Sequence, residues 1–424
     1  MTDAGGDRPP GEAEPGEPAA ALTAARPRRM PLMVLAGGCA ISLLGLGARS
    51  GFGLFLEPMT VARDWSRESF ALALAIQNLL WGLTMPFAGA LADRFGPVRI
   101  LTIGALVTMA GIWGMAEVES ATMLYLTAGL LTGLGGAFTA FSLAVAAMLR
   151  VVGEARRSLV LGLGMAFGSL GMVVFSPVLQ ALITSAGWHD ALVVLSFSSL
   201  LIIPLAFLLP NNTEAIGAPV AGQRLAEALG EAARHRGYLL LTAGFFVCGF
   251  HVTFINVHFP AYVTGFELDA TVGAWALALI GLFNIGGSLM SGIAGQRWPK
   301  KTGLSFIYMS RAIAILALLL LPKTELTMYA FAAAMGLLWL STVPLTTGIV
   351  AQVFGLRYFA TLSGIVFFSH QIGSFLGAWL GGFVYDQTGS YDGMWIAGIV
   401  FGVLAAIIHL PINEAPLARL RQKA

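Results

Sequence analysis

Twelve long apolar segments, separated by short polar breaks, constrain this chain more than any other feature of its sequence. They cover residues 32–58, 69–92, 98–116, 121–149, 158–186, 190–210, 239–264, 271–295, 302–322, 326–353, 358–384 and 391–411. About 20 apolar residues allow a helix to cross a bilayer, so each segment is long enough to do so. Only 11% of the residues are charged, whereas soluble domains carry roughly 25%. The sequence therefore predicts an all-α membrane protein with twelve transmembrane helices.

The basic residues divide unevenly when the loops between these segments are assigned alternately to two sides of the membrane. If the N-terminus lies on side one, that side receives 19 of the 24 Lys and Arg residues, and side two receives Arg63, Arg67 and Lys323. The remaining two, Arg49 and Arg311, lie inside segments. Cytoplasmic loops carry an excess of Lys and Arg. We therefore expect side one, with both termini, to face the cytoplasm.

The longest loop, residues 211–238, divides the segments into two groups of six. Residues 1–30 are rich in Pro, Gly and Glu and show no apolar periodicity, which is typical of a disordered tail. The predicted organisation is a disordered cytoplasmic tail (1–30), an N-terminal six-helix half (31–210), a cytoplasmic inter-half loop (211–238), a C-terminal six-helix half (239–411) and a cytoplasmic tail (412–424).

The two halves repeat each other in sequence. "GALADRFG" at 89–96 matches "GIAGQRWP" at 292–299, an offset of 203 residues. "ARSGFGLFLEP" at 48–58 matches "FHVTFINVHFP" at 250–260, an offset of 202 residues. Two parallel six-helix repeats are typical of one transporter architecture, in which the substrate site lies near the membrane midplane between the halves.

The segment "GALADRFGPVRI" resembles the loop motif between the second and third helices of the major facilitator superfamily. The residues that fit the motif, and that we predict to form a cytoplasmic gate, are Gly89, Asp93, Arg94, Gly96 and Arg99. The resemblance covers about residues 31–411 and implies the major facilitator fold, with two pseudo-symmetric halves. Asp93, at a helix end on side one, can pair with a neighbouring arginine or a helix N-terminus and so hold that side shut.

Within the superfamily, "RSGFGLFLEPM" followed by "DWSRESFALA" looks like the monocarboxylate transporter family and its bacterial relatives, including oxalate:formate exchangers. In that family a basic residue on the first helix is implicated in carboxylate binding, and the matching residue here is Arg49. Animal members carry an Asp and an Arg on the eighth helix, where this chain has Phe283 and Gly287, with Asn284 nearby. The exchangers carry a basic residue on the eleventh helix, where this chain has His370.

Apart from helix ends, the segments contain no Asp or Glu, and their ionisable residues are basic. These residues are Arg49, His251, His258, Arg311 and His370. A charged side chain at the centre of a membrane helix costs roughly 3 kcal/mol on insertion scales, which makes such residues candidates for function. A cavity lined by them would attract an anion, and the planar fork of an arginine fits a carboxylate.

Each of these residues has a structural alternative. Arg49 could instead bond backbone carbonyls of a neighbouring helix, and Arg311 could brace the C-terminal half rather than bind substrate. The offset of 202 places His251 opposite Arg49, and His258 shares a helix face with His251. These two histidines and His370 are candidates for substrate or proton binding, because histidine titrates near neutral pH. Polar side chains that could orient a substrate, or could join helices instead, are Gln77, Asn78, Asn256 and Asn284.

We therefore expect a secondary active transporter that moves a small organic anion, a monocarboxylate, by alternating access, with protons as the candidate coupling ion. The alternative is an efflux or exchange carrier of the same superfamily for another anionic metabolite or drug. An intramembrane metal enzyme is disfavoured because no His-Glu-x-x-His motif is present. We expect a monomer in the lipid bilayer of a bacterial inner membrane, with no enzymatic activity, no cofactor, no metal and no nucleic-acid partner.

Overall fold

The computed structural model describes residues 32–152, 156–211, 224–355 and 357–421, and within them all regular structure is helical. The predicted tail at 1–30 lies outside the described residues, and so do residues 212–223 of the predicted inter-half loop. Residues 31–424 form one compact unit. The elements of the first half are α1 (Leu32–Ser50), η1 (Phe52–Phe55), α2 (Leu56–Arg63), α3 (Arg67–Phe95), α4 (Pro97–Ala116), α5 (Ala121–Leu124), the π-helical η2 (Tyr125–Leu131), α6 (Thr132–Phe138), α7 (Phe141–Leu149), α8 (Arg157–Ser198), η4 (Ser199–Leu201) and α9 (Ile202–Ala206).

The second half begins with a short amphipathic helix that precedes the seventh predicted span. Its elements are α10 (Leu225–Arg234), α11 (Arg236–Thr264), α12 (Ala270–Arg297), α13 (Lys300–Leu320), α14 (Glu325–Leu338), α15 (Thr342–Phe354), α16 (Phe359–Thr388), α17 (Asp392–His409) and α18 (Ala418–Arg421).

Among the described residues, eleven helical stretches are long and apolar enough to cross a membrane. One of them, Leu159–Ala206, has 48 residues, about twice the length that one crossing needs. Its backbone leaves the helical conformation at Gly187, where φ is 88° and ψ is 164°. Because the chain turns there, this stretch accounts for two predicted spans. The predicted all-helical membrane fold is confirmed.

The helices begin where short polar side chains can cap them. Ser66 precedes α3, and its hydroxyl accepts a hydrogen bond from the Ser69 amide at 3.1 Å. Asp269 caps α12 in the same way, because its carboxylate accepts from the Thr271 amide at 2.8 Å. Hydrogen bonds from the side chain and backbone of Thr271 lower the pKa of the Asp269 carboxyl. These caps fix the starts of two helices that line the interface between the halves.

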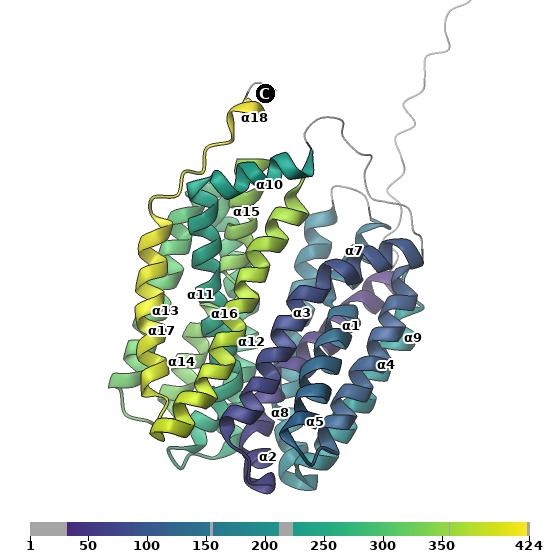
Figure 1. The fold of residues 1–424 in the computed structure, drawn as a ribbon, viewed down its shortest axis with the longest axis vertical. Helices are drawn as coiled ribbons and strands as arrows, with labels where there is room; N and C mark the ends of the chain where they lie inside the picture. The colour runs from purple at the N-terminus through teal and green to yellow at the C-terminus, as the bar shows by residue number, and fades with distance from the viewer. Residues whose placement is uncertain (1–31, 153–155, 212–223, 356, 422–424) are drawn as a thin grey trace, which may run out of the picture. The chain divides into compact units, whose positions relative to one another are not determined.

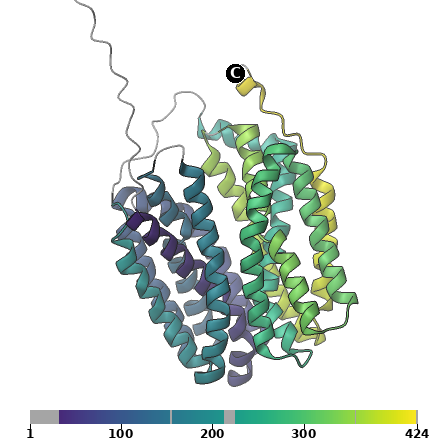
Figure 2. The same ribbon diagram turned by 180° about the vertical axis from the view of Figure 1, so that it is seen from behind.

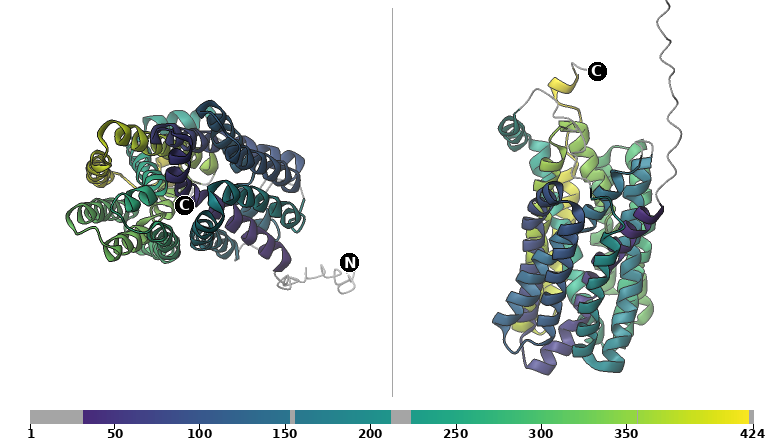
Figure 3. Two further views of the ribbon diagram at one scale, coloured as in Figure 1. Left: turned by 90° about the horizontal axis from the view of Figure 1, so that it is seen from below. Right: turned by 90° about the vertical axis from the view of Figure 1, so that its right-hand side faces the viewer.

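The two halves lie side by side, the first in purple to blue and the second in teal to yellow (Figure 1), as the view from behind also shows (Figure 2). Seen along the helices, each half is a bundle (Figure 3). The interface between the halves is built from α3 with α16, α8 with α12, and η1 with α11. The face that carries α10 and α18 is side one, and the face that carries α2 is side two.

The helices α11 and α16 pack with their backbones in close contact. A Cβ atom added at Gly373 would collide with the carbonyl oxygen of Phe246, and one added at Gly377 would collide with the carbonyl oxygen of Phe250. Small residues at this spacing let membrane helices approach closely. The contact fixes the position of α16, and with it the position of His370.

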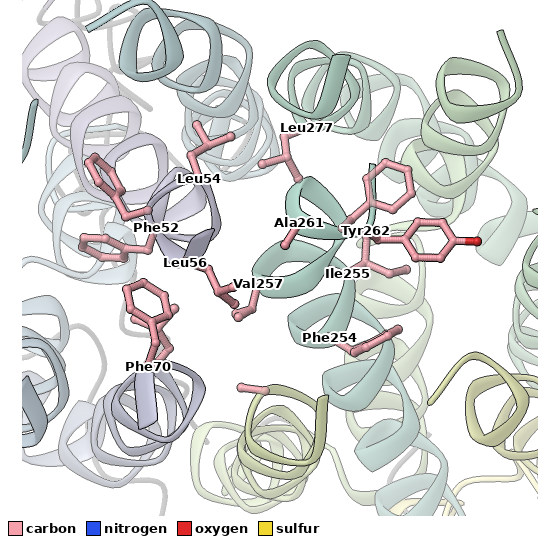
Figure 4. Close-up of a cluster of buried hydrophobic side chains, with 14 of the residues drawn as sticks. Phe52, Leu54, Leu56, Phe70, Phe254, Ile255, Val257, Ala261, Tyr262 and Leu277 are labelled. Atoms are coloured by element: carbon pink, nitrogen blue, oxygen red, sulfur yellow. The ribbon is translucent and has the colours of Figure 1, made fainter. Parts of the chain in front are cut away.

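Buried apolar side chains from both halves meet in one cluster (Figure 4). Phe52 and Leu56 of the first half belong to the same buried cluster as Val257 of α11. A Cβ atom added at Gly53 would collide with the carbonyl oxygen of Asn256, so the backbones of η1 and α11 approach closely as well. This contact closes the space between the halves toward side two.

Candidate functional site

A cavity of about 210 Å³ lies between the two halves. Its wall is formed by α1, η1, α3, α7 and α8 of the first half and by α11, α12, α15 and α16 of the second, with the break between α14 and α15. The predicted substrate-binding residues that line it are Arg49, Gln77, Asn78, Asn256, Asn284 and His370. None of the described residues on this wall is Asp or Glu. Among the described residues, the one fixed charge on the wall is therefore the positive charge of Arg49.

Arg49 lies in the last turn of α1, where the partial negative charge of a helix C-terminus favours a cation. Its Nη2 donates a hydrogen bond to Oδ1 of Asn78, and its guanidinium carbon lies 3.9 Å from the centre of the Trp81 ring. Asn78 is held in turn, because its Nδ2 donates to the Leu74 carbonyl at 2.7 Å. Both contacts orient the guanidinium without neutralising it, so a carboxylate in the cavity could supply the counter-charge.

A smaller space of about 50 Å³ lies on the other side of Arg49, inside the first half. Three of the residues that line it are Thr108, Thr132 and Thr139. A water molecule takes about 30 Å³ in the liquid, so this space has room for one or two. Arg49 thus lies between a small, mostly apolar space that contains three threonine hydroxyls and the larger cavity between the halves.

His370 of α16 lies on the wall contributed by the second half. Its Nδ1 donates to Oε1 of Gln371 at 2.9 Å, which leaves Nε2 as the acceptor of the neutral ring. The ring stacks on Phe367, with 5.6 Å between the centroids, and contacts Phe245 at 5.0 Å. His370 is the predicted proton-coupling residue that the structure brings to the cavity.

The structure does not bring His251 and His258 to this cavity, contrary to the expectation from the repeat. Both rings are buried inside the second half, and each Nε2 donates to a backbone carbonyl, that of Gly398 at 2.8 Å for His251 and that of Ala378 at 2.7 Å for His258. An offset of 203 would pair Arg49 with Val252, which does line the cavity. Shifting the alignment by one residue rotates the matched side chain by about 100° around the helix. This shift accounts for the wrong prediction that His251 faces Arg49.

The side chains of Asn284 and Ser169, both on the wall, join the halves. Asn284 donates from Nδ2 to the Ser169 hydroxyl at 2.8 Å, and its Oδ1 accepts from the Leu340 amide at 2.9 Å. Both polar atoms of the Asn284 side chain are therefore hydrogen-bonded within the protein. By contrast, Gln77 and Asn256 make no hydrogen bond through their side chains to other described residues, so these amides are available to a ligand.

Arg311 lies away from the cavity, fully buried between α13 and the break that separates α14 from α15. Its Nη2 donates to the carbonyl oxygens of Leu338, at 2.6 Å, and Trp339. The last carbonyls of a helix lack intrahelical donors, and a cation is favoured there. The geometry therefore corresponds to the bracing alternative for Arg311 rather than to substrate binding.

The predicted gate motif lies at the side-one end of α3. The carboxylate of Asp93 accepts a hydrogen bond from Nη2 of Arg150 at 2.7 Å. Both residues belong to the first half, so this ion pair does not join the halves. Gly96 has a φ of 88° and lies against the side chain of Asn211, which explains why the tight turn between α3 and α4 uses glycine.

Hydrogen bonds between the halves gather at side two, in a group that we call the side-two lock. The lock consists of Arg67, Glu68, Trp379, Asp386 and Tyr391. The Asp386 carboxylate accepts from the backbone amides of Arg67 at 3.1 Å and Glu68 at 2.7 Å, at the N-terminus of α3. Arg67 donates from Nη1 to the Tyr391 hydroxyl at 2.9 Å, and Trp379 donates from Nε1 to Glu68 at 2.9 Å. The lock holds side two closed in this structure.

The sequence analysis missed the aromatic wall of the cavity. Its members are Phe52, Trp81, Phe141, Phe245, Trp339 and Phe367. Helical spacing could have found one of them, because Trp81 follows Gln77 by four residues and Asn78 by three, which places all three on one helix face. The others come from separate helices, and no spacing within one helix indicates that they meet.

Comparisons with known proteins agree with this architecture. The family model described as Major Facilitator Superfamily matches residues 38–378. Monocarboxylate transporter 13 of Bos taurus is 27% identical over 390 residues, which cover 89% of each chain. Monocarboxylate transporter 11 of Mus musculus is 28% identical over 373 residues, covering 84% of this chain and 81% of that one. The uncharacterized MFS-type transporter YcxA of Bacillus subtilis is 25% identical over 377 residues, covering 85% and 90%.

A solved structure shows the same fold. It is the crystal structure of a bacterial homolog to the human lysosomal transporter Spinster, in an inward-facing and unoccupied conformation. The TM-score is 0.74 at 15% sequence identity, and the alignment covers 90% of this chain and 96% of that one. With the family model spanning most of the helices, the chain belongs to the major facilitator superfamily.

Proposed function

We propose that this major facilitator superfamily transporter moves a small organic anion, a monocarboxylate, across the membrane. The observation that carries the proposal is the position of Arg49, a cation on the wall of a cavity between the halves that has no described Asp or Glu on its lining. A single carboxylate would neutralise the site, and it could bind the guanidinium through two parallel hydrogen bonds. Similarity to proteins named monocarboxylate transporters supports the same assignment.

The same charge argument disfavours other substrates. A lipophilic cation would enter a cavity in which the guanidinium of Arg49, the one fixed charge among the described lining residues, repels it. A dicarboxylate would bring a second negative charge for which the described residues of the wall offer no second fixed cation, and burying an unpaired charge is strongly unfavourable. The substrate is therefore an anion with one charge.

Transport proceeds by alternating access, in which the two halves rock around the cavity. The side-two lock and the apolar contact between η1 and α11 correspond to a state closed on side two. We place side one, with both termini, in the cytoplasm, because the loops assigned to it carry most of the Lys and Arg residues. The membrane is the inner membrane of a bacterium, and the transporter acts as a monomer.

Proton coupling, where it operates, uses His370 or the substrate itself. Among the described residues of the cavity wall, His370 is the histidine, and none is a carboxylate that could take this role. Protonation of His370 would add a second positive charge near the bound anion, which would link the two binding events.

The test is uptake of labelled carboxylates into proteoliposomes by Arg49→Gln and Arg49→Lys variants. The first loses the charge and the fork, and we expect it to abolish carboxylate transport while the protein remains folded and monodisperse. The second keeps the charge and should retain part of the activity. Arg297→Gln, at an exposed position at the end of α12, is the matched control and should transport normally. Normal uptake by a well-folded Arg49→Gln protein would refute the proposal.

A further inference from the structure

The cavity wall is mostly apolar and unusually aromatic for a site with one charged residue. Six aromatic side chains line it together with Met165 and Met172, and Asn78 and Trp81 hold the guanidinium of Arg49 on one part of the wall. Ligand pockets of this kind use a few polar groups to orient the ligand and apolar groups to bind its body. The wall therefore offers one end for a carboxylate and a larger region for an apolar group.

The size of the cavity indicates how large that apolar group is. A dry apolar cavity of about 150 Å³ binds benzene, and this cavity measures about 210 Å³. The difference leaves room for a carboxylate on a short arm. An acid with only two or three carbons would leave most of the aromatic wall without a contact, and unfilled apolar space forfeits dispersion energy.

We propose that the cavity selects monocarboxylates whose body is a single aryl group, over short-chain acids and over aryl amino acids. This inference rests on the proposed function, because it assigns the carboxylate to Arg49. The aryl body contacts the aromatic and methionine side chains in offset or edge-to-face geometry. An aryl amino acid also carries an ammonium group, for which the described lining residues include no carboxylate partner.

The experiment compares three labelled probes on the purified full-length protein in proteoliposomes: propanoate, 3-phenylpropanoate and phenylalanine. Binding of the unlabelled compounds is followed in parallel by the fluorescence of the tryptophans, two of which, Trp81 and Trp339, lie on the wall. Burying the phenyl group should make 3-phenylpropanoate bind at least about tenfold more tightly than propanoate. Phenylalanine should bind more weakly than 3-phenylpropanoate by a similar factor.

A size variant tests whether the apolar body occupies this space. Val343 lies on the cavity wall, and Val343→Phe would fill part of the region that the aryl group needs. The ratio of 3-phenylpropanoate affinity to propanoate affinity should fall at least about fivefold, because small and large acids are affected unequally. The same substitution at Val178, which is 51% exposed on the outer face of α8, is the control and should leave the ratio unchanged.

The outcomes separate this inference from the proposed function. If propanoate equals or exceeds 3-phenylpropanoate while uptake still depends on Arg49, the aryl preference is wrong and the carboxylate transporter stands. If phenylalanine binds as well as 3-phenylpropanoate, the aryl amino-acid exclusion is wrong. If no carboxylate binds and lipophilic cations do, both proposals fail together.

Discussion

Replacing Asp386 by alanine should make the protein open more often toward side two. Asp386 lies at the end of α16, in the second half, and its carboxylate accepts hydrogen bonds from the first two backbone amides of α3, in the first half. Those amides have no intrahelical partner. Since the contact crosses between the halves, it exists only while side two is closed, and its loss raises the free energy of that state alone.

The size of the effect follows from the geometry. Asp386 serves α3 as an external N-terminal cap, and removing such a cap costs about 0.5–2 kcal/mol. The carboxylate is exposed to solvent, which places the loss near the middle of that range, at about 1 kcal/mol. A change of that size alters the ratio of open to closed states about fivefold.

The assay measures labelling of a single cysteine at Val257, which is buried in the contact between the halves. The native cysteines, Cys39 and Cys248, are replaced first. An impermeant maleimide added from side two should label the Asp386→Ala protein about fivefold faster than its parent, because closed protein is protected. Asp392→Ala, a nearby exposed carboxylate on α17, is the control and should change nothing. An equal labelling rate with Asp386→Ala would show that this contact does not set the equilibrium.

Four further changes test other parts of the structure. Asp93→Asn removes the charge that pairs with Arg150. We expect maleimide labelling from side one to increase, because the pair supports closure of that side. An unchanged labelling rate would show that Asp93 is not part of the gate. Arg311→Leu leaves two buried carbonyls without a donor, at about 1–3 kcal/mol, and should lower the melting temperature without altering carboxylate affinity. His251→Gln should leave the pH profile of uptake unchanged, because the His251 ring bonds a backbone carbonyl away from the cavity, whereas His370→Gln should shift it.

The helices could be predicted well because apolar length relates directly to the thickness of a bilayer. Arg49 stood out for the same reason, since a charge inside such a run has few structural explanations. Gln77 and Asn78 were candidates because they are polar side chains within an apolar segment, and both line the cavity. Each of these inferences uses residues within a single helix, which the sequence encodes directly.

The orientation of side chains between helices could not be predicted in this way. Two alignments of the repeat differed by one residue, and that single step decides whether His251 or Val252 occupies the position matching Arg49. Depth in the membrane changes by only about 1.5 Å per residue, whereas orientation changes by about 100°. The sequence pattern therefore indicated how deep His251 lies and not which way it points. The direction in which the His251 side chain points is set by the packing of α11 on α16 and α17.

The break between α14 and α15 has a consequence for how the chain enters the membrane. Arg311 is fully buried, and its described hydrogen-bond acceptors are the Leu338 and Trp339 carbonyls. These carbonyls are free to accept because the next membrane segment is interrupted there. Inserted alone, α13 would carry a guanidinium into the bilayer at a cost of roughly 3 kcal/mol. Paired with the following segment as a helical hairpin, it gains both acceptors at once. During biogenesis the ninth and tenth spans thus depend on each other, and a nascent chain that ends after Lys323 would hold α13 only loosely in the membrane.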